Sequence, residues 1–137
     1  MRSLLVLLFA CALVGCGASP QTGCTVTGFS LGVDSASPAT SGSYVADHRA
    51  APPGNSVAFT AGEGPLSGPG CPTPALLKLV PALWAVADPI NVSISSADDA
   101  SNGVATCVGA TDGPVKVSAK ATQGAFTETA TASLTCQ

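Results

Sequence analysis

Short segments in which apolar and polar residues alternate recur along most of the chain. In "SVAFTA", for example, Val57, Phe59 and Ala61 alternate with smaller or polar residues. Because successive side chains of a strand point to opposite faces, this period of two places the three residues on one buried face. Seven segments are predicted as strands in this way: "FSLGV" with Phe29, Leu31 and Val33, "SVAFTA", "ALWAVAD" with Trp84 and Val86, "INVSISS" with Ile90, Val92 and Ile94, "VATCV" from Val104, "VKVSA" from Val115, and "FTETATASLTC" from Phe126.

Clusters of glycine and proline separate these segments and indicate turns. One helix candidate, "TPALLKLVPALW", begins near Pro74 and is interrupted by Pro81, so at most a short helical turn is expected there. Short strands at roughly ten-residue spacing make an all-β fold, a single antiparallel β-sandwich of about seven strands, the most economical prediction. A small barrel or a jelly roll would also fit the spacing. In each case Trp84, at mid-chain, is expected to be a core residue.

The first residues have the pattern of an export signal. After Arg2, the segment from Ser3 to Val14 is an uninterrupted apolar run of about a dozen residues. A transmembrane helix needs roughly 20 apolar residues, so a membrane-spanning anchor is the poorer interpretation.

The run ends in "LVGC", from Leu13 to Cys16, which resembles the lipobox of bacterial lipoproteins. The resemblance implies that the Cys16 thiol accepts diacylglycerol, that residues 1–15 are removed as a lipoprotein signal peptide, and that Cys16 becomes the acylated N-terminus. Residues 16–23 would be a lipidated tether and residues 24–137 the folded domain. Gly17, where aspartate would signal inner-membrane retention, favours the outer membrane if the cell has one. The alternative is ordinary signal cleavage near Ala18, with Cys16 as one more small apolar residue.

Composition limits the classes of partner. The chain has 5 basic and 8 acidic residues in 137. Without Arg2 the mature charge is about −4, which disfavours nucleic acid, because such binding needs clustered lysine and arginine. Removal of the signal leaves enough residues for one domain. Acyl chains contribute about 0.8 kcal/mol per buried methylene, so the membrane is the expected partner of the anchor.

Four cysteines remain in the mature domain after Cys16, and an even number in an exported chain indicates two disulfides. They are Cys24, Cys71, Cys107 and Cys136, and none of them has the spacing of a zinc site. Three pairings are possible. If successive strands of a sandwich run in opposite directions, Cys24 and Cys71 lie at one end and Cys107 and Cys136 at the other. We therefore predict the bridges Cys24–Cys71 and Cys107–Cys136.

From Trp84 onward the chain resembles the bacterial Ig-like domains of surface proteins such as invasins and intimins. The matching segments are "LWAVADP", "NGVATCVGATDGPVKVSAKA" and the final strand rich in threonine and alanine. The resemblance covers about 55 residues closely and implies a seven-stranded Ig-like sandwich with a role in spacing, adhesion or carbohydrate contact. The cysteines and the insert "SGPGCPTPALLKLVP" depart from the family pattern.

Residues suited to catalysis are few, and no catalytic residue, metal site or cofactor is predicted. The lone histidine, His48, is expected in a solvent-exposed loop, where Asp47 could not easily orient it. Asp98 and Asp99 are expected in a hairpin loop with Asn102, as a polar turn or, alternatively, a weak calcium loop. Asn91 has the form of a glycosylation sequon and is expected to point outward from a strand.

These observations favour a non-enzymatic, lipid-anchored protein of the bacterial cell envelope. Its domain is expected to act as a binding, adhesion or spacer module toward an envelope protein or a carbohydrate. The alternative is a secreted enzyme or inhibitor that uses the apolar loop of residues 66–81 as its active segment.

Overall fold

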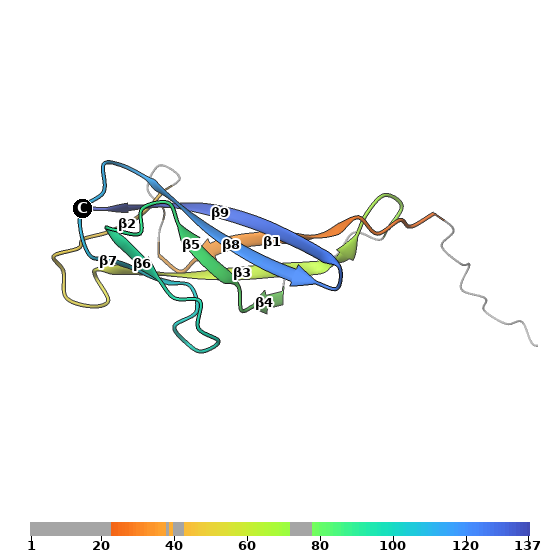
Figure 1. Cartoon of the computed structure of the whole chain (residues 1–137), viewed down its shortest axis with the longest axis horizontal. Helices are drawn as coiled ribbons and strands as arrows, with labels where there is room; N and C mark the ends of the chain where they lie inside the picture. The colour runs from red at the N-terminus through yellow and green to blue at the C-terminus, as the bar shows by residue number, and fades with distance from the viewer. Residues whose placement is uncertain (1–22, 38, 40–42, 72–77) are drawn as a thin grey trace, which may run out of the picture.

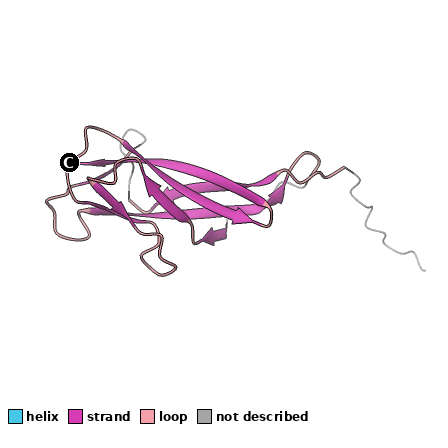
Figure 2. Cartoon of the chain, viewed as in Figure 1, coloured by secondary structure: helices cyan, strands magenta, loops and turns pink. Residues whose placement is uncertain are grey.

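The structure is a computed structural model, and it describes residues 23–37, 39, 43–71 and 78–137. In this part of the chain there are nine strands and no helix, arranged as two facing sheets (Figures 1 and 2). The strands are β1 (Gly28–Ser35), β2 (Tyr44–Ala46), β3 (Ser56–Ser67), β4 (Lys78–Val80), β5 (Leu83–Val86), β6 (Val92–Ile94), β7 (Val104–Cys107), β8 (Val115–Gln123) and β9 (Phe126–Cys136).

The first sheet has the order β1-β3-β7-β6 and is antiparallel throughout. Its longest strand, β3, also pairs with β4, which occupies the same edge as β7 but farther along. The second sheet has the order β2-β9-β8-β5, in which β2 runs parallel to β9 and the other pairs are antiparallel. The chain is therefore a β-sandwich with one parallel pair.

The core lies between the sheets and follows the predicted alternation. Val57, Phe59 and Ala61 of β3 are all buried, and they face inward-pointing residues of β8 and β9 such as Val117 and Leu134. Trp84 on β5 is only 8% exposed, with its ring centroid 6.2 Å from that of Phe59. Trp84 is thus a core residue, as predicted.

All seven predicted strands are present, but one of them starts later than expected. Ile90 was expected on a buried strand face and is instead 83% exposed in the turn before β6. The Asp88 carboxylate accepts hydrogen bonds from the backbone amides of Ile90 and Asn91, which holds these residues in a turn. Asn91 therefore does not point outward from a strand, and its side-chain amide donates to Asp88 at 2.8 Å.

Two strands were not predicted. β2 and β4 contain only three residues each, too few to show an alternating pattern of apolar and polar residues. The helical turn expected after Pro74 falls mostly outside the described residues, but Lys78 to Val80, at its end, form a strand. The unpaired edge of β3 supplies their hydrogen bonds, since Ala61, Gly62 and Glu63 are their partners.

Both disulfides join the pairs of cysteines that were predicted from the directions of the strands. Cys24 precedes β1 and Cys71 follows β3, and these strands are antiparallel neighbours, so the two cysteines meet at one end with a Cα–Cα distance of 4.5 Å. Cys107 ends β7 and Cys136 ends β9, with a Cα–Cα distance of 5.6 Å. The second bridge therefore links one sheet to the other.

Candidate binding surface

An exposed apolar strip follows the chain where it passes from the first sheet to the second. Leu79 is 69% exposed and Leu83 is 66% exposed, and Pro81 between them is also exposed. The intervening residues point inward, because Val80 packs against the core and Ala82 is buried. We call Leu79, Pro81 and Leu83 the Leu79 strip. Apolar area left in water costs roughly 25 cal/mol per Å², so three exposed apolar residues at alternate positions of one segment make it a candidate contact surface.

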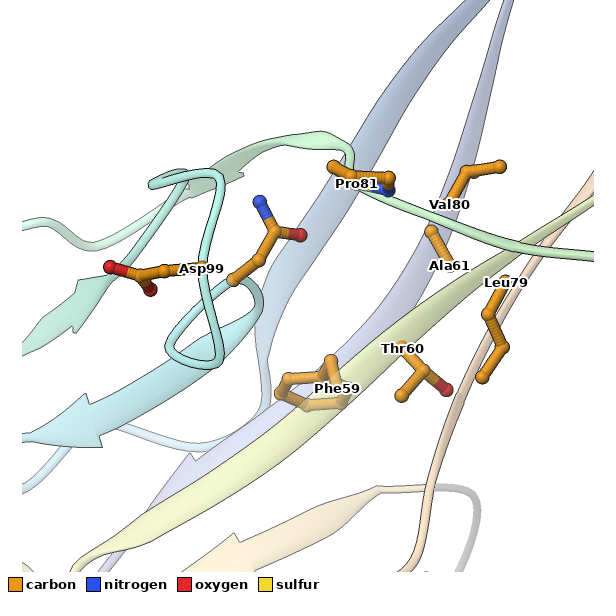
Figure 3. A pocket seen from close by; sticks show the side chains of 8 residues that line it. Phe59, Thr60, Ala61, Leu79, Val80, Pro81 and Asp99 are labelled. Carbon is orange, nitrogen blue, oxygen red and sulfur yellow. The ribbon is translucent and has the colours of Figure 1, made fainter.

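A hollow of about 230 Å³ opens on one side of Leu79 (Figure 3). The β3 residues Phe59, Thr60 and Ala61 form one part of its lining, and the loop before β7 forms another. The full lining consists of Phe59, Thr60, Ala61, Leu79, Val80, Pro81, Asp99 and Asn102. It is mostly apolar, which suits an aliphatic or aromatic group better than an ion.

Asn102 holds the loop side of this hollow in place. Its side-chain oxygen accepts a hydrogen bond from the indole nitrogen of Trp84 at 2.8 Å and one from the backbone of Ala82 at 3.2 Å. Its side-chain nitrogen donates to the carbonyls of Ala82 and Ala97. Asn102 thus uses both lone pairs of its side-chain oxygen and both of its side-chain N–H groups. It also provides the hydrogen-bond partner for the indole N–H, the only polar group of the buried Trp84 side chain. Sequence reasoning placed Asn102 in a polar loop but missed this role, because its partners are distant in the sequence.

The neighbouring acidic residues form a polar turn. Asp99 accepts hydrogen bonds from the Ser101 amide at 2.7 Å and from the Ser101 hydroxyl at 2.6 Å. These bonds hold the pKa of the Asp99 carboxyl below its ordinary value. In Figure 3 the Asp99 carboxylate points away from Leu79 and Pro81. Within the ranges that the structure describes, no three side chains of His, Cys, Asp or Glu gather to hold a metal ion.

His48 lies in the turn after β2 and is partly buried. Its Nδ1 atom pairs with the backbone oxygen of Gln137, while the Asp47 carboxylate accepts a hydrogen bond from the Arg49 amide at 2.9 Å. Asp47 is thus used in a local turn rather than to orient the imidazole. His48 thus lies in a loop, as expected, but it is partly rather than largely exposed, and its side chain joins this turn to the residue that follows the last strand.

A second hollow, of about 410 Å³, lies on the other side of Leu79. It is lined by Gly32, Val33, Asp34, Thr60, Gly62 and Leu79, so it shares Thr60 and Leu79 with the first hollow. The two hollows and the Leu79 strip together form the candidate binding surface, which runs from the first sheet to Leu83 on β5 of the second sheet. The sequence signal for it was the apolar loop of residues 66–81, of which the structure describes 66–71 and 78–81.

Among the described residues, no helix has the length and apolar character needed to cross a bilayer. The predicted lipidation site Cys16, its signal peptide and most of the tether lie outside the described residues. No protein-family model, curated protein or solved structure matched this chain.

We expect the free energy of unfolding to fall at acidic pH partly because Asp88 becomes protonated. Hydrogen bonds from the Asn91 side chain, and then from the Asn91 and Ile90 amides, lower the pKa of Asp88 below its ordinary 3.8. A lowered folded-state pKa stabilises the fold above the unfolded-state value, and this contribution is lost as the pH falls through the folded-state pKa. Urea titrations from neutral pH to below pH 3.8 should therefore show a shallower decline for Asp88→Asn than for wild type.

Asp112→Asn is the matched control, because no side-chain hydrogen bond to Asp112 is found in the described part of the chain. A decline in Asp88→Asn as steep as that of wild type would show that the Asp88 turn does not contribute to the acid sensitivity.

Proposed function

We propose that this protein is a lipid-anchored envelope protein whose Ig-like domain binds a partner through the Leu79 strip. The observation that carries the binding role is the exposure of Leu79, which lines both hollows, with the exposed Leu83 four residues along the chain. Ile90 and Val108 are also exposed, but neither of them lines a hollow. The anchor rests on the sequence from Leu13 to Cys16, and Gly17 favours the outer membrane of a two-membrane envelope.

The strand order supports an Ig-like arrangement. If β1, β3, β5, β6, β7, β8 and β9 are read as strands A to G, the sheets have the orders A-B-E-D and G-F-C. Trp84 then lies on strand C, where immunoglobulin domains carry a buried tryptophan. Three features depart from that pattern. The inter-sheet disulfide joins strands E and G rather than B and F, β2 is added between A and B and pairs parallel with G, and β4 is added between B and C.

The anchor is tested with Cys16→Ala. We expect wild-type protein in the membrane fraction with an acylated N-terminal peptide by mass spectrometry. The variant is expected to carry no acyl mass, and to enter the soluble fraction wherever its signal is cut at another site. A variant that stayed in the membrane after its signal had been removed would contradict anchoring through this cysteine.

The binding role is tested separately, with a photo-crosslinking amino acid in place of Leu79 in cells that express the full chain. Val108, which is 60% exposed and does not line either hollow, is the control position. A discrete cross-linked species from position 79 but not from position 108 is expected. A glycan array with the purified protein asks whether the ligand is a carbohydrate. No cross-link and no glycan signal would favour a spacer role instead.

The alternative of a secreted inhibitor or enzyme involves the same segment. The described end of the 66–81 loop is fastened to the domain by pairing of β4 with β3, and it exposes Leu79. An inhibitor would cross-link from position 79 to a protease or another enzyme and would retain its activity after Cys16→Ala, which separates it from an anchored module.

A further inference from the structure

The floor of the larger hollow is bare backbone. Gly32 and Gly62 are direct cross-strand partners in β1 and β3, and Gly62 is in turn the partner of Leu79 in β4. Cross-strand partners point to the same face of a sheet, and Val33, Ala61 and Val80, one residue along, point into the core. The row Gly32–Gly62–Leu79 therefore belongs to the outer face of the sheet, with Gly62 buried at its centre, Gly32 partly buried and Leu79 exposed at one end.

The next outward row supplies polar groups. Asp34 and Thr60 are cross-strand partners, and both line the hollow. Rows on one face lie about 7 Å apart along a strand, so these groups stand at one end of the glycine floor. The hollow thus combines an apolar wall, a flat backbone floor, a hydroxyl and a carboxylate.

The Asp34 carboxylate is oriented but only partly used. Its Oδ1 atom accepts hydrogen bonds from the Ser35 amide at 2.8 Å and from the Tyr44 hydroxyl at 3.1 Å. Burial, and next the hydrogen bond to Asp34 and its charge, raise the pKa of Tyr44, so this hydroxyl stays protonated and keeps donating. No ammonium or guanidinium group is among the Asp34 hydrogen-bond partners in the described part of the chain, which leaves Oδ2 for a ligand.

We propose that this hollow binds an arginine side chain presented by a partner protein, with its stem against Leu79 and its guanidinium on Asp34. Long basic side chains bury their methylene stems on apolar surface while the charged end pairs elsewhere. A planar guanidinium can lie on a glycine floor and donate to both Asp34 and the Thr60 hydroxyl, whereas an ammonium is a compact, strongly hydrated charge. The negative net charge of the chain, −3, also favours a basic partner. This inference rests on the proposed binding role of the Leu79 strip.

The test is a titration of the purified, ¹⁵N-labelled full chain with Nα-acetyl-arginine methylamide, followed by NMR. We expect saturable shifts of the Gly32, Thr60, Gly62 and Leu79 amides at millimolar concentrations. Asp34→Asn, which keeps an acceptor for Tyr44, is expected to weaken binding about tenfold through loss of the charge-assisted hydrogen bond. Asp98→Asn, an exposed acid that lines neither hollow, is the matched control and should bind as wild type does. Leu79→Ser should also weaken binding without unfolding the domain, because Leu79 is largely exposed.

Two further probes test whether the hollow requires a positive charge and whether it requires a guanidinium group. Nα-acetyl-norleucine methylamide has an apolar stem without charge, and equal shifts with it would overturn the assignment of a cationic ligand. Nα-acetyl-lysine methylamide should bind more weakly, and equal binding would overturn the choice of guanidinium over ammonium. Absence of saturable shifts with the arginine probe would overturn the inference itself, while a cross-link from position 79 would still support the binding role.

Discussion

Replacing Phe59 with alanine is expected to lower the free energy of unfolding by about 3 to 5 kcal/mol, the usual range for removal of a buried aromatic side chain. Phe59 is 1% exposed and is the largest fully buried side chain among the described residues. Its ring meets that of Tyr44 edge-on at a centroid distance of 5.1 Å and lies beside Trp84. It therefore joins β3 of one sheet to β2 and β5 of the other. Many of the other buried core residues are alanines, which have no side chain long enough to refill the cavity.

Urea denaturation followed by fluorescence measures this loss directly, because Trp84 is the only tryptophan of the chain and lies next to Phe59. Phe126→Ala is the matched control, since Phe126 is the same residue type but only partly buried at the start of β9. A loss for Phe59→Ala no larger than that for Phe126→Ala would contradict the central position assigned to Phe59.

The second large effect is expected from replacing Cys107 and Cys136 together with alanine. A loop of 29 residues closed by a disulfide corresponds to about 3.5 kcal/mol in the chain-entropy description. Both cysteines are buried, so their sulfur atoms also fill space between the sheets. We expect the double variant to lose about this much free energy of unfolding or more, measured by the same denaturation.

A companion variant replaces Cys24 and Cys71 together with alanine. It tests whether loop length or the position of the bridge in the fold decides how strongly a disulfide stabilises this domain. Its loop spans 47 residues, so loop length alone predicts the larger loss, about 4 kcal/mol. Cys24, however, lies on an exposed segment. The Thr27 amide bonds to Ser67 at the end of β3 and the Thr25 amide to Pro69 beyond it, and this end can open without disturbing the core. We therefore expect the smaller loss here, and the reverse order would contradict the assignment of the Cys107–Cys136 bridge as the main link between the sheets.

Much of the sandwich could be predicted because strand patterns are local. The alternation of Val57, Phe59 and Ala61 identifies both the strand and its buried face, and the structure places all three in the core. The cysteine pairs followed from strand direction alone. Antiparallel neighbours bring the start of one strand to the end of the next, and Cys24 and Cys71 occupy such positions.

The candidate site could not be predicted in the same way. Leu79 belongs to a run of apolar residues that suggested a helical turn, and it became part of a strand because β3 offered an unpaired edge. Asn102 looked like one more residue of a polar loop until its side chain was found against Trp84. Both features depend on partners that are distant in the sequence.

The sequence by itself determined the all-β class, the presence of seven strands and the positions of four pairable cysteines, and it carries the lipobox-like segment ending at Cys16. Only the tertiary structure decided which residues stand beside one another across the sheets. The register of β1, β3 and β4 puts Gly32, Gly62 and Leu79 in one row with Asp34 and Thr60 beside it. A shift of one residue would turn that row into the core, and no local pattern specifies the register of a strand as short as β4.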